Sequence, residues 1–330
     1  MLRKWRRGVG VSVLVVGLCG CSRIKITLGM RVSLPKVQVA SMEVVQYQHA
    51  GIGPGETSAL IATLTEPDGK ELVTEGKGKG KVLWNQLAVA TSVVSVNKKG
   101  VLTLPRDPRV SDGKIGHLTV TIPSHPGVTA EIDVPLRYDY NFVSNFNGAS
   151  GSSGSNGSDG SDGSSGSSGS TDPDNPSAGG DGGNGGNGGN GTDGGNGGDA
   201  PPVNVVITLR AGAHPLLQVG VTAPGHKERF YLVDPAGGSM TVEANGGNGG
   251  SGGSGGRGGN GGSGGSGIPP GSPGSSGLPG SNGSGGSPGN GGQITVTYDA
   301  SAKAYLQLLH VQAARGPAPV MKEGVVGPLW

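Results

Sequence analysis

The chain has 330 residues, 70 of them glycine, and its 25 basic and 23 acidic side chains give a formal net charge of +2. This near-neutral balance argues against nucleic acid as a partner, because a basic patch would be expected for one. Both cysteines, Cys19 and Cys21, fall in an N-terminal signal. The rest of the chain therefore offers no intrachain disulfide, cysteine-ligated zinc or thiol nucleophile.

Residues 1–21 have the features of a secretory signal. Basic residues precede an apolar stretch from Gly8 to Gly17, which is too short to span a membrane as a helix. Leu18-Cys19-Gly20-Cys21 follows and resembles the bacterial lipobox. That resemblance implies a lipid on Cys21 that anchors the protein in a membrane, and Ser22 favours the outer membrane. Residues 22–34 are then a tether. An ordinary secretory signal cleaved nearby is the alternative.

Residues 35–142 are predicted to be a β-sandwich of the immunoglobulin-like kind. Polar and apolar residues alternate over His117–Ile122 and Val128–Val134, as expected for half-buried strands. Asp68-Gly69 and Asn97-Lys98-Lys99-Gly100 are hairpin signals. Trp84 is expected in the core or at its rim, and no cysteine pair supports the antibody type of sandwich.

Glycine recurs at every third residue in four runs of similar length. They are Gly148 to Gly169 and Gly179 to Gly197, within residues 143–200, and Gly246 to Gly267 and Gly271 to Gly292, within residues 246–292. A period of three matches the polyproline II helix, in which each run would be a rod of about 65 Å. The first three runs contain no proline, which separates them from collagen, and only the fourth is collagen-like.

The repeat resembles the polyglycine II bundles of antifreeze proteins and of phage tail-tip adhesins. A lone polyproline II helix leaves its amides and carbonyls unpaired, so neighbouring rods with glycine facing inward can pair them. Most triplets of runs two and three have glycine at two positions, which leaves two positions without a side chain, whereas most triplets of runs one and four have glycine at one. We therefore expect runs two and three at the centre of four rods. The alternative is a disordered, flexible tether, as is usual for glycine- and serine-rich stretches.

A second β domain is expected from residues 201–245 joined to residues 293–330, with runs three and four as an inserted hairpin. Neither part alone has enough strands for a core. The strands expected in it are Val203–Leu209, Leu216–Val221, Arg229–Val233, Ser239–Glu243, Ile294–Tyr298 and Tyr305–Val311.

Nothing in the sequence indicates an enzyme or a required cofactor. Gly252-Gly253-Ser254-Gly255-Gly256 matches the GxSxG motif without the strand and helix that a nucleophile elbow needs. The six histidines lack metal-ligand spacing. A set of aspartates could hold Ca²⁺ with their carboxylate oxygens: Asp159, Asp162, Asp172, Asp174, Asp181, Asp193 and Asp199. Their spacing matches neither the EF-hand loop nor the calcium-binding nonapeptide, and solvated acids at a rod surface are the simpler account. A lysine-rich loop around residues 76–80 is either a contact to anionic lipid or polysaccharide, or a solvated turn.

The sequence therefore predicts a lipid-anchored envelope protein in which the runs act as a stiff spacer or display element. The loops at the end of such a scaffold are where binding is expected, with a polysaccharide or an envelope protein as partner. The candidate contact residues are Asp172, Asp174, Asn175, Ile268, Pro269 and Pro270. The alternatives are a periplasmic binding or assembly module with a passive glycine-rich tether, and an ice-binding polyglycine II protein.

Overall fold

A computed structural model describes residues 31–49, 51–210, 212 and 214–330. The protein is mainly β and divides into two compact units, one ending at Arg137 and the other running from Tyr138 to Trp330. The sequence places the end of the first β domain at residue 142. The division falls earlier in the structure because the segment after Tyr138 forms a strand in a sheet of the second unit.

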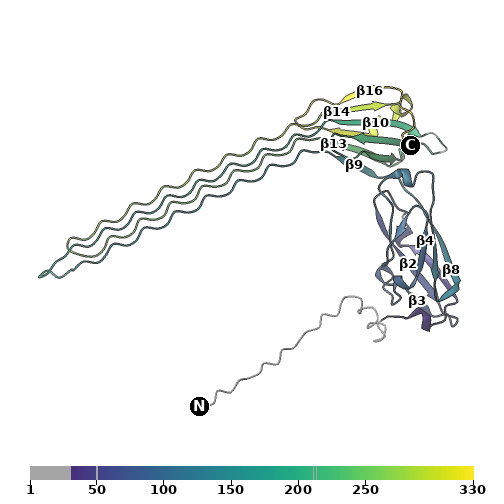
Figure 1. Cartoon of the computed structure of the whole chain (residues 1–330), viewed down its shortest axis with the longest axis horizontal. Helices are drawn as coiled ribbons and strands as arrows, with labels where there is room; N and C mark the ends of the chain where they lie inside the picture. Colours follow the sequence, from purple (N-terminus) through teal and green to yellow (C-terminus); the bar gives the residue numbers. More distant parts are fainter. Residues whose placement is uncertain (1–30, 50, 211, 213) are drawn as a thin grey trace, which may run out of the picture. The chain divides into compact units, whose positions relative to one another are not determined.

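Unit 1 consists of two antiparallel sheets that enclose one hydrophobic core (Figure 1). One sheet has the order β1-β2-β6-β5 with β3 beside β2, and the other has the order β4-β7-β8. The strands are β1 (Ser41–Gln46), β2 (Thr57–Thr65), β3 (Glu71–Val73), β4 (Ala88–Thr91), β5 (Ser95–Val96), β6 (Val101–Thr103), β7 (Gly116–Ile122) and β8 (His125–Val134). Short 3-10 turns separate them: η1 (Leu34–Lys36), η2 (Tyr47–His49), η3 (Gly76–Gly78), η4 (Trp84–Gln86) and η5 (Pro108–Val110).

The alternating pattern places the core of unit 1 as expected. β7 buries every second residue, and Leu118, Val120 and Ile122 share one cluster with Leu60 and Leu64 of β2. Both hairpin signals are confirmed, since Asp68-Gly69 lies between β2 and β3, and Asn97 to Gly100 connects β5 to β6.

Trp84 is buried in this core, with 2% of its surface exposed, against the backbone of Gly100. A Cβ at Gly100 would lie 2.2 Å from Trp84 Cε2, and its φ of +71° also disfavours side chains. We therefore expect Gly100→Ala to lower the free energy of unfolding of unit 1 by about 2 kcal/mol or more, measured by denaturant unfolding. Gly127→Ala is the matched control, because nothing lies within 4 Å of its Cβ. Equal losses in both variants would contradict this prediction.

Unit 2 holds a five-stranded sheet, β12-β11-β10-β14-β16, and a three-stranded sheet, β15-β13-β9. The strands are β9 (Asn141–Asn145), β10 (Val203–Arg210), β11 (Leu216–Thr222), β12 (Arg229–Val233), β13 (Ser239–Glu243), β14 (Ile294–Tyr298), β15 (Leu309–Gln312) and β16 (Val320–Glu323). β10 pairs in parallel with β14, so the segments on either side of runs three and four share one sheet, as the sequence predicts.

The strand expected over Tyr305–Val311 is wrong for most of its length. Ala300–Leu308 forms the 3-10 helix η6, and β15 begins only at Leu309. The reason lies just before the segment, where the Asp299 side chain accepts a hydrogen bond from the Ser301 amide and so starts a helix. Hydrogen bonds from Ser301 also lower the pKa of Asp299 below its ordinary value.

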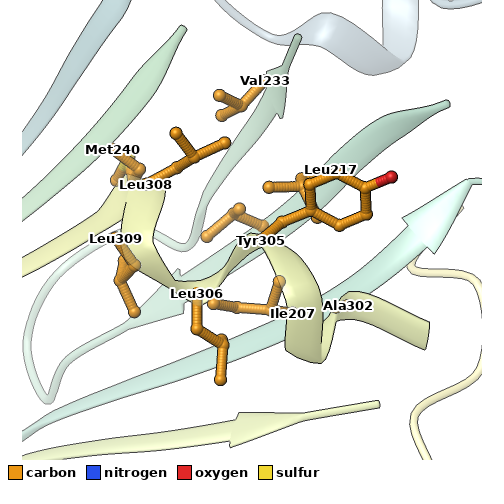
Figure 2. A pocket seen from close by; sticks show the side chains of 10 residues that line it. Ile207, Leu217, Val233, Met240, Ala302, Tyr305, Leu306, Leu308 and Leu309 are labelled. Carbon is orange, nitrogen blue, oxygen red and sulfur yellow. The ribbon is translucent and has the colours of Figure 1, made fainter. Parts of the chain in front are cut away.

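η6 packs over the five-stranded sheet and completes the core of unit 2. A cavity of about 10 Å³ lies between η6 and the two sheets, lined by Ile207, Leu217, Met240, Tyr305 and Leu309 among others (Figure 2). This volume is about that of one water, and its lining is almost wholly apolar. The cavity is a packing defect of the core and not a ligand site.

Candidate functional site

The four glycine runs lie side by side and extend from the sheets of unit 2 (Figure 1). Run one continues β9 and run three continues β13, while runs two and four lead into β10 and β14. None of the run glycines has a φ in the left-handed region, no residue of the runs is helical, and Figure 1 shows the runs as extended traces.

Backbone hydrogen bonds join the runs at every triplet. Gly157 of run one donates to Ser254 of run three, and Gly189 of run two donates to Ser158 of run one, at 2.8 Å and 2.7 Å. Run two also donates to run four, run three to run two, and run four to run three. Runs two and three therefore each bond to three neighbours, and runs one and four to two. The central position expected for runs two and three is confirmed.

Close backbone contact explains why the repeat needs glycine. A Cβ on Gly256 would lie 1.9 Å from the Ser158 carbonyl oxygen, and one on Gly283 would lie 2.0 Å from that of Thr192. Real Cβ atoms do not approach so closely. Thr192 of run two stands at a position that is glycine in the other triplets of that run. A Cβ at the equivalent Gly189 would lie 3.1 Å from its nearest neighbour in run one, which leaves more room than at Gly256 or Gly283. The Thr192 hydroxyl accepts the Ser155 amide at 2.7 Å.

A row of asparagine and aspartate side chains makes a second set of hydrogen bonds, which is not among the features predicted from the sequence. Every third residue of run two is Asn or Asp, and each Oδ1 accepts a backbone amide of run four at 2.6–2.9 Å. We call this row the Asx ladder. Its members are Asp181, Asn184, Asn187, Asn190, Asp193, Asn196 and Asp199.

A shorter row links run one to run three in the same way. Asn156, Asp159 and Asp162 accept the amides of Ser254, Arg257 and Asn260. These aspartates are exposed, but they are not simply solvated acids, because one oxygen of each holds a neighbouring run. The signal was present in the sequence as an unbroken Asn or Asp at the third position of run two.

The sheets and the runs share one register. Ser239 of β13 pairs with Asn141 of β9, and the same separation of 98 residues joins Asn260 to Asp162 far along the runs. Val203 pairs with Ile294, and the corresponding separation of 91 residues joins Asp181 to Ser272 near the tip. The parallel strand pairs of the sheets therefore continue into the runs without a slip.

Arg315 holds the base of runs three and four. Its guanidinium donates to the carbonyls of Gly246 and Gly247 in run three, and its Nε donates to that of Gly289 in run four. These contacts tie the C-terminal segment of unit 2 to the point where the runs leave the sheets.

The six candidate contact residues are brought together at the opposite end of the runs. Ile268 donates its amide to the Ser177 carbonyl at 2.9 Å, and Gly179 donates to that of Pro269 at 3.0 Å. These bonds join the two loops into one tip. Asp172, Asp174, Asn175, Ile268, Pro269 and Pro270 are all exposed there. The Asp172 side chain accepts the Asp174 amide, which shapes the loop.

The other sequence candidates do not form a site. Cys21 and the signal lie outside the described residues. Gly252 to Gly256 lies within an extended run. Within the described part of the chain, no group of His, Cys, Asp or Glu side chains is arranged to hold a metal ion, and no helix has the length and apolar character needed to cross a bilayer. Lys70 pairs with Glu66, and Lys77 lies over the ring of Tyr47.

Comparison with known proteins gives no relative. No protein-family model, no curated protein and no solved structure matches the chain. A function for this chain therefore has to be argued from its own geometry.

Proposed function

We propose that this is a non-catalytic, lipid-anchored protein of the bacterial outer membrane, in which a four-rod polyglycine II bundle is a stiff spacer that displays its tip loops. The anchor would be the lipid on Cys21. Unit 1 would be an immunoglobulin-like sandwich, which its two sheets around one core and the buried Trp84 support.

The unbroken register from the sheets to the tip carries this proposal. A passive tether needs no cross-run bonds, whereas here each run bonds to two or three neighbours at every triplet. Each such bond contributes about 0.5–1.5 kcal/mol net, so a bend that separates the runs would cost the sum of several bonds at once. Bonding of this density supports a rod that resists bending.

The tip is the part of such a rod best placed to meet a partner. Its exposed residues combine two carboxylates, an amide side chain and an apolar group, Ile268, with 45% of its surface exposed. Carboxylates and amides bind sugar hydroxyls by hydrogen bonds, and an apolar side chain packs against the face of a sugar ring. A polysaccharide of the envelope or of another surface fits this chemistry.

We expect the triple variant Asp174→Ala, Asn175→Ala and Ile268→Ser to weaken attachment to the polysaccharide roughly tenfold, which is about 1.4 kcal/mol of binding free energy. Attachment of the full-length protein to isolated envelope polysaccharide would be measured. No hydrogen bond that holds the tip loops together uses these three side chains.

The matched control is the triple variant Ser165→Ala, Ser168→Ala and Ser276→Ala, which changes three exposed side chains along the runs. It should attach like the original protein. Unchanged attachment of the tip variant would contradict the display role and favour the alternative in which the β units bind and the runs only connect them.

A further inference from the structure

Eleven asparagines of this chain are followed directly by glycine. In such a pair the glycine nitrogen attacks the asparagine Cγ easily, because no side chain on the glycine hinders it. The attack needs an amide hydrogen that solvent can remove and a side chain that is free to turn. The eleven are Asn147, Asn156, Asn184, Asn187, Asn190, Asn196, Asn245, Asn248, Asn260, Asn282 and Asn290.

In eight of these pairs both reacting groups are held. The asparagine Oδ1 accepts a backbone amide, and the amide of the following glycine donates to a backbone carbonyl of another segment. At Asn187, for example, Oδ1 accepts the Leu278 amide while Gly188 donates to the Leu278 carbonyl. The eight are Asn147, Asn156, Asn184, Asn187, Asn190, Asn196, Asn245 and Asn282.

In the other three pairs both groups are free. Asn248, Asn260 and Asn290 are exposed, and within the described residues neither their side chains nor the amides of Gly249, Gly261 and Gly291 have a hydrogen-bond partner. To react, the peptide between asparagine and glycine has to rotate towards the asparagine side chain. At these three sites the rotation breaks one hydrogen bond, which the asparagine carbonyl accepts from a neighbouring segment. At the eight other sites two or more hydrogen bonds have to break, and one of them is the bond that the glycine amide donates.

We infer that Asn248, Asn260 and Asn290 are sites of spontaneous deamidation in the folded protein and that the other eight asparagines are protected. The glycine nitrogen bonds to Cγ and loses its proton, and the Cγ–Nδ2 bond breaks to release ammonia, which leaves a succinimide. Water then opens the ring at one of its two carbonyls and gives either aspartate or isoaspartate. Water is the only co-reactant.

The two products have different effects on the runs. Aspartate keeps the backbone unchanged and adds one negative charge, which the runs already accommodate at Asp181 and Asp193. Isoaspartate adds a methylene to the backbone. At Asn260 this would displace the rest of run three from its three-residue register, where Gly262 and Gly265 donate to run two. Modification at this position would loosen the part of the bundle nearest the tip.

Trypsin separates six of the eight protected asparagines from the reactive ones. Cleavage after Arg137 and Arg210 yields residues 138–210, which hold these six. Cleavage at Arg229, Arg257 and Lys303 yields residues 230–257 and 258–303, which hold the three reactive asparagines together with the protected Asn245 and Asn282. The full-length protein would be incubated at physiological temperature, digested and analysed by mass spectrometry with fragmentation that locates each site. We expect deamidation at Asn248, Asn260 and Asn290 at least about tenfold faster than elsewhere, since the protected sites must first open locally.

The same chain in denaturant is the control, where all eleven pairs should react at similar rates. A triple variant with Asn248→Gln, Asn260→Gln and Asn290→Gln should lose nearly all deamidation in the folded state, because the longer side chain closes its ring much more slowly. Equal rates at all eleven sites of the folded protein would overturn the inference, and so would resistance of the three sites under conditions in which the denatured chain reacts.

Discussion

Replacing Gly283 with alanine will destabilise the glycine runs, whereas the same change at Gly285 will not. A Cβ on Gly283 would lie 2.0 Å from the carbonyl oxygen and 2.4 Å from the carbonyl carbon of Thr192 in run two. Runs two and four would have to separate locally. This also weakens the bond from the Gly283 amide to Gly253. Overpacking and the weakened bonds together predict a loss of about 3 kcal/mol in the free energy of unfolding of the runs.

Gly285 is a close control because it lies on the same run, two residues from Gly283. Its Cβ would meet only the Gly250 carbonyl oxygen, at an ordinary contact distance of 3.7 Å. Amide hydrogen exchange at Gly280 and Gly286 in the two variants measures the difference, and thermal unfolding followed by circular dichroism gives a second measurement. Similar protection in both variants would contradict the close packing of the runs.

Removing three rungs of the Asx ladder will expose the amides of run four to solvent. Asn184, Asn187 and Asn190 accept the amides of Ser275, Leu278 and Ser281 at 2.8–2.9 Å. Replacing all three with alanine removes those acceptors. Because the bonds are exposed, each is expected to contribute at the low end of the usual range, so the triple variant should lose about 1.5 kcal/mol.

The corresponding triple aspartate variant separates the hydrogen bond from the side chain's bulk. Aspartate keeps Oδ1 and loses only the amide NH₂, and Asp181, Asp193 and Asp199 already accept amides of run four in this way. It should retain slow exchange at Ser275, Leu278 and Ser281, while the alanine variant should exchange rapidly there. Rapid exchange in both variants, or in neither, would show that the ladder does not hold run four.

The sequence predicts the β-strands and the order of the runs because both have a simple period. β12, β13 and β14 begin and end at the residues expected from alternation. The central place of runs two and three follows from counting the glycine positions in each triplet, since a run with three neighbours has another backbone close to two positions of each triplet. Both the period of three and this number of glycines can be read directly from the sequence.

Features that depend on distant partners could not be predicted. β9 becomes a strand of unit 2 through pairing with β13, which lies about a hundred residues later in the chain. η6 depends on a cap at Asp299 that competes with a strand-like pattern. The ladder residues have the composition of a solvated surface, and only the position of run four beside them reveals the bonds that they make.

The shared register limits how the length of these rods can change in evolution. A triplet gained in the middle of run two alone would shift every later residue of that run by one step against three neighbours at once. Longer or shorter rods therefore require matched gains or losses in all four segments. Homologues of this protein should differ in rod length by whole triplets that are added or lost at the same level in every segment.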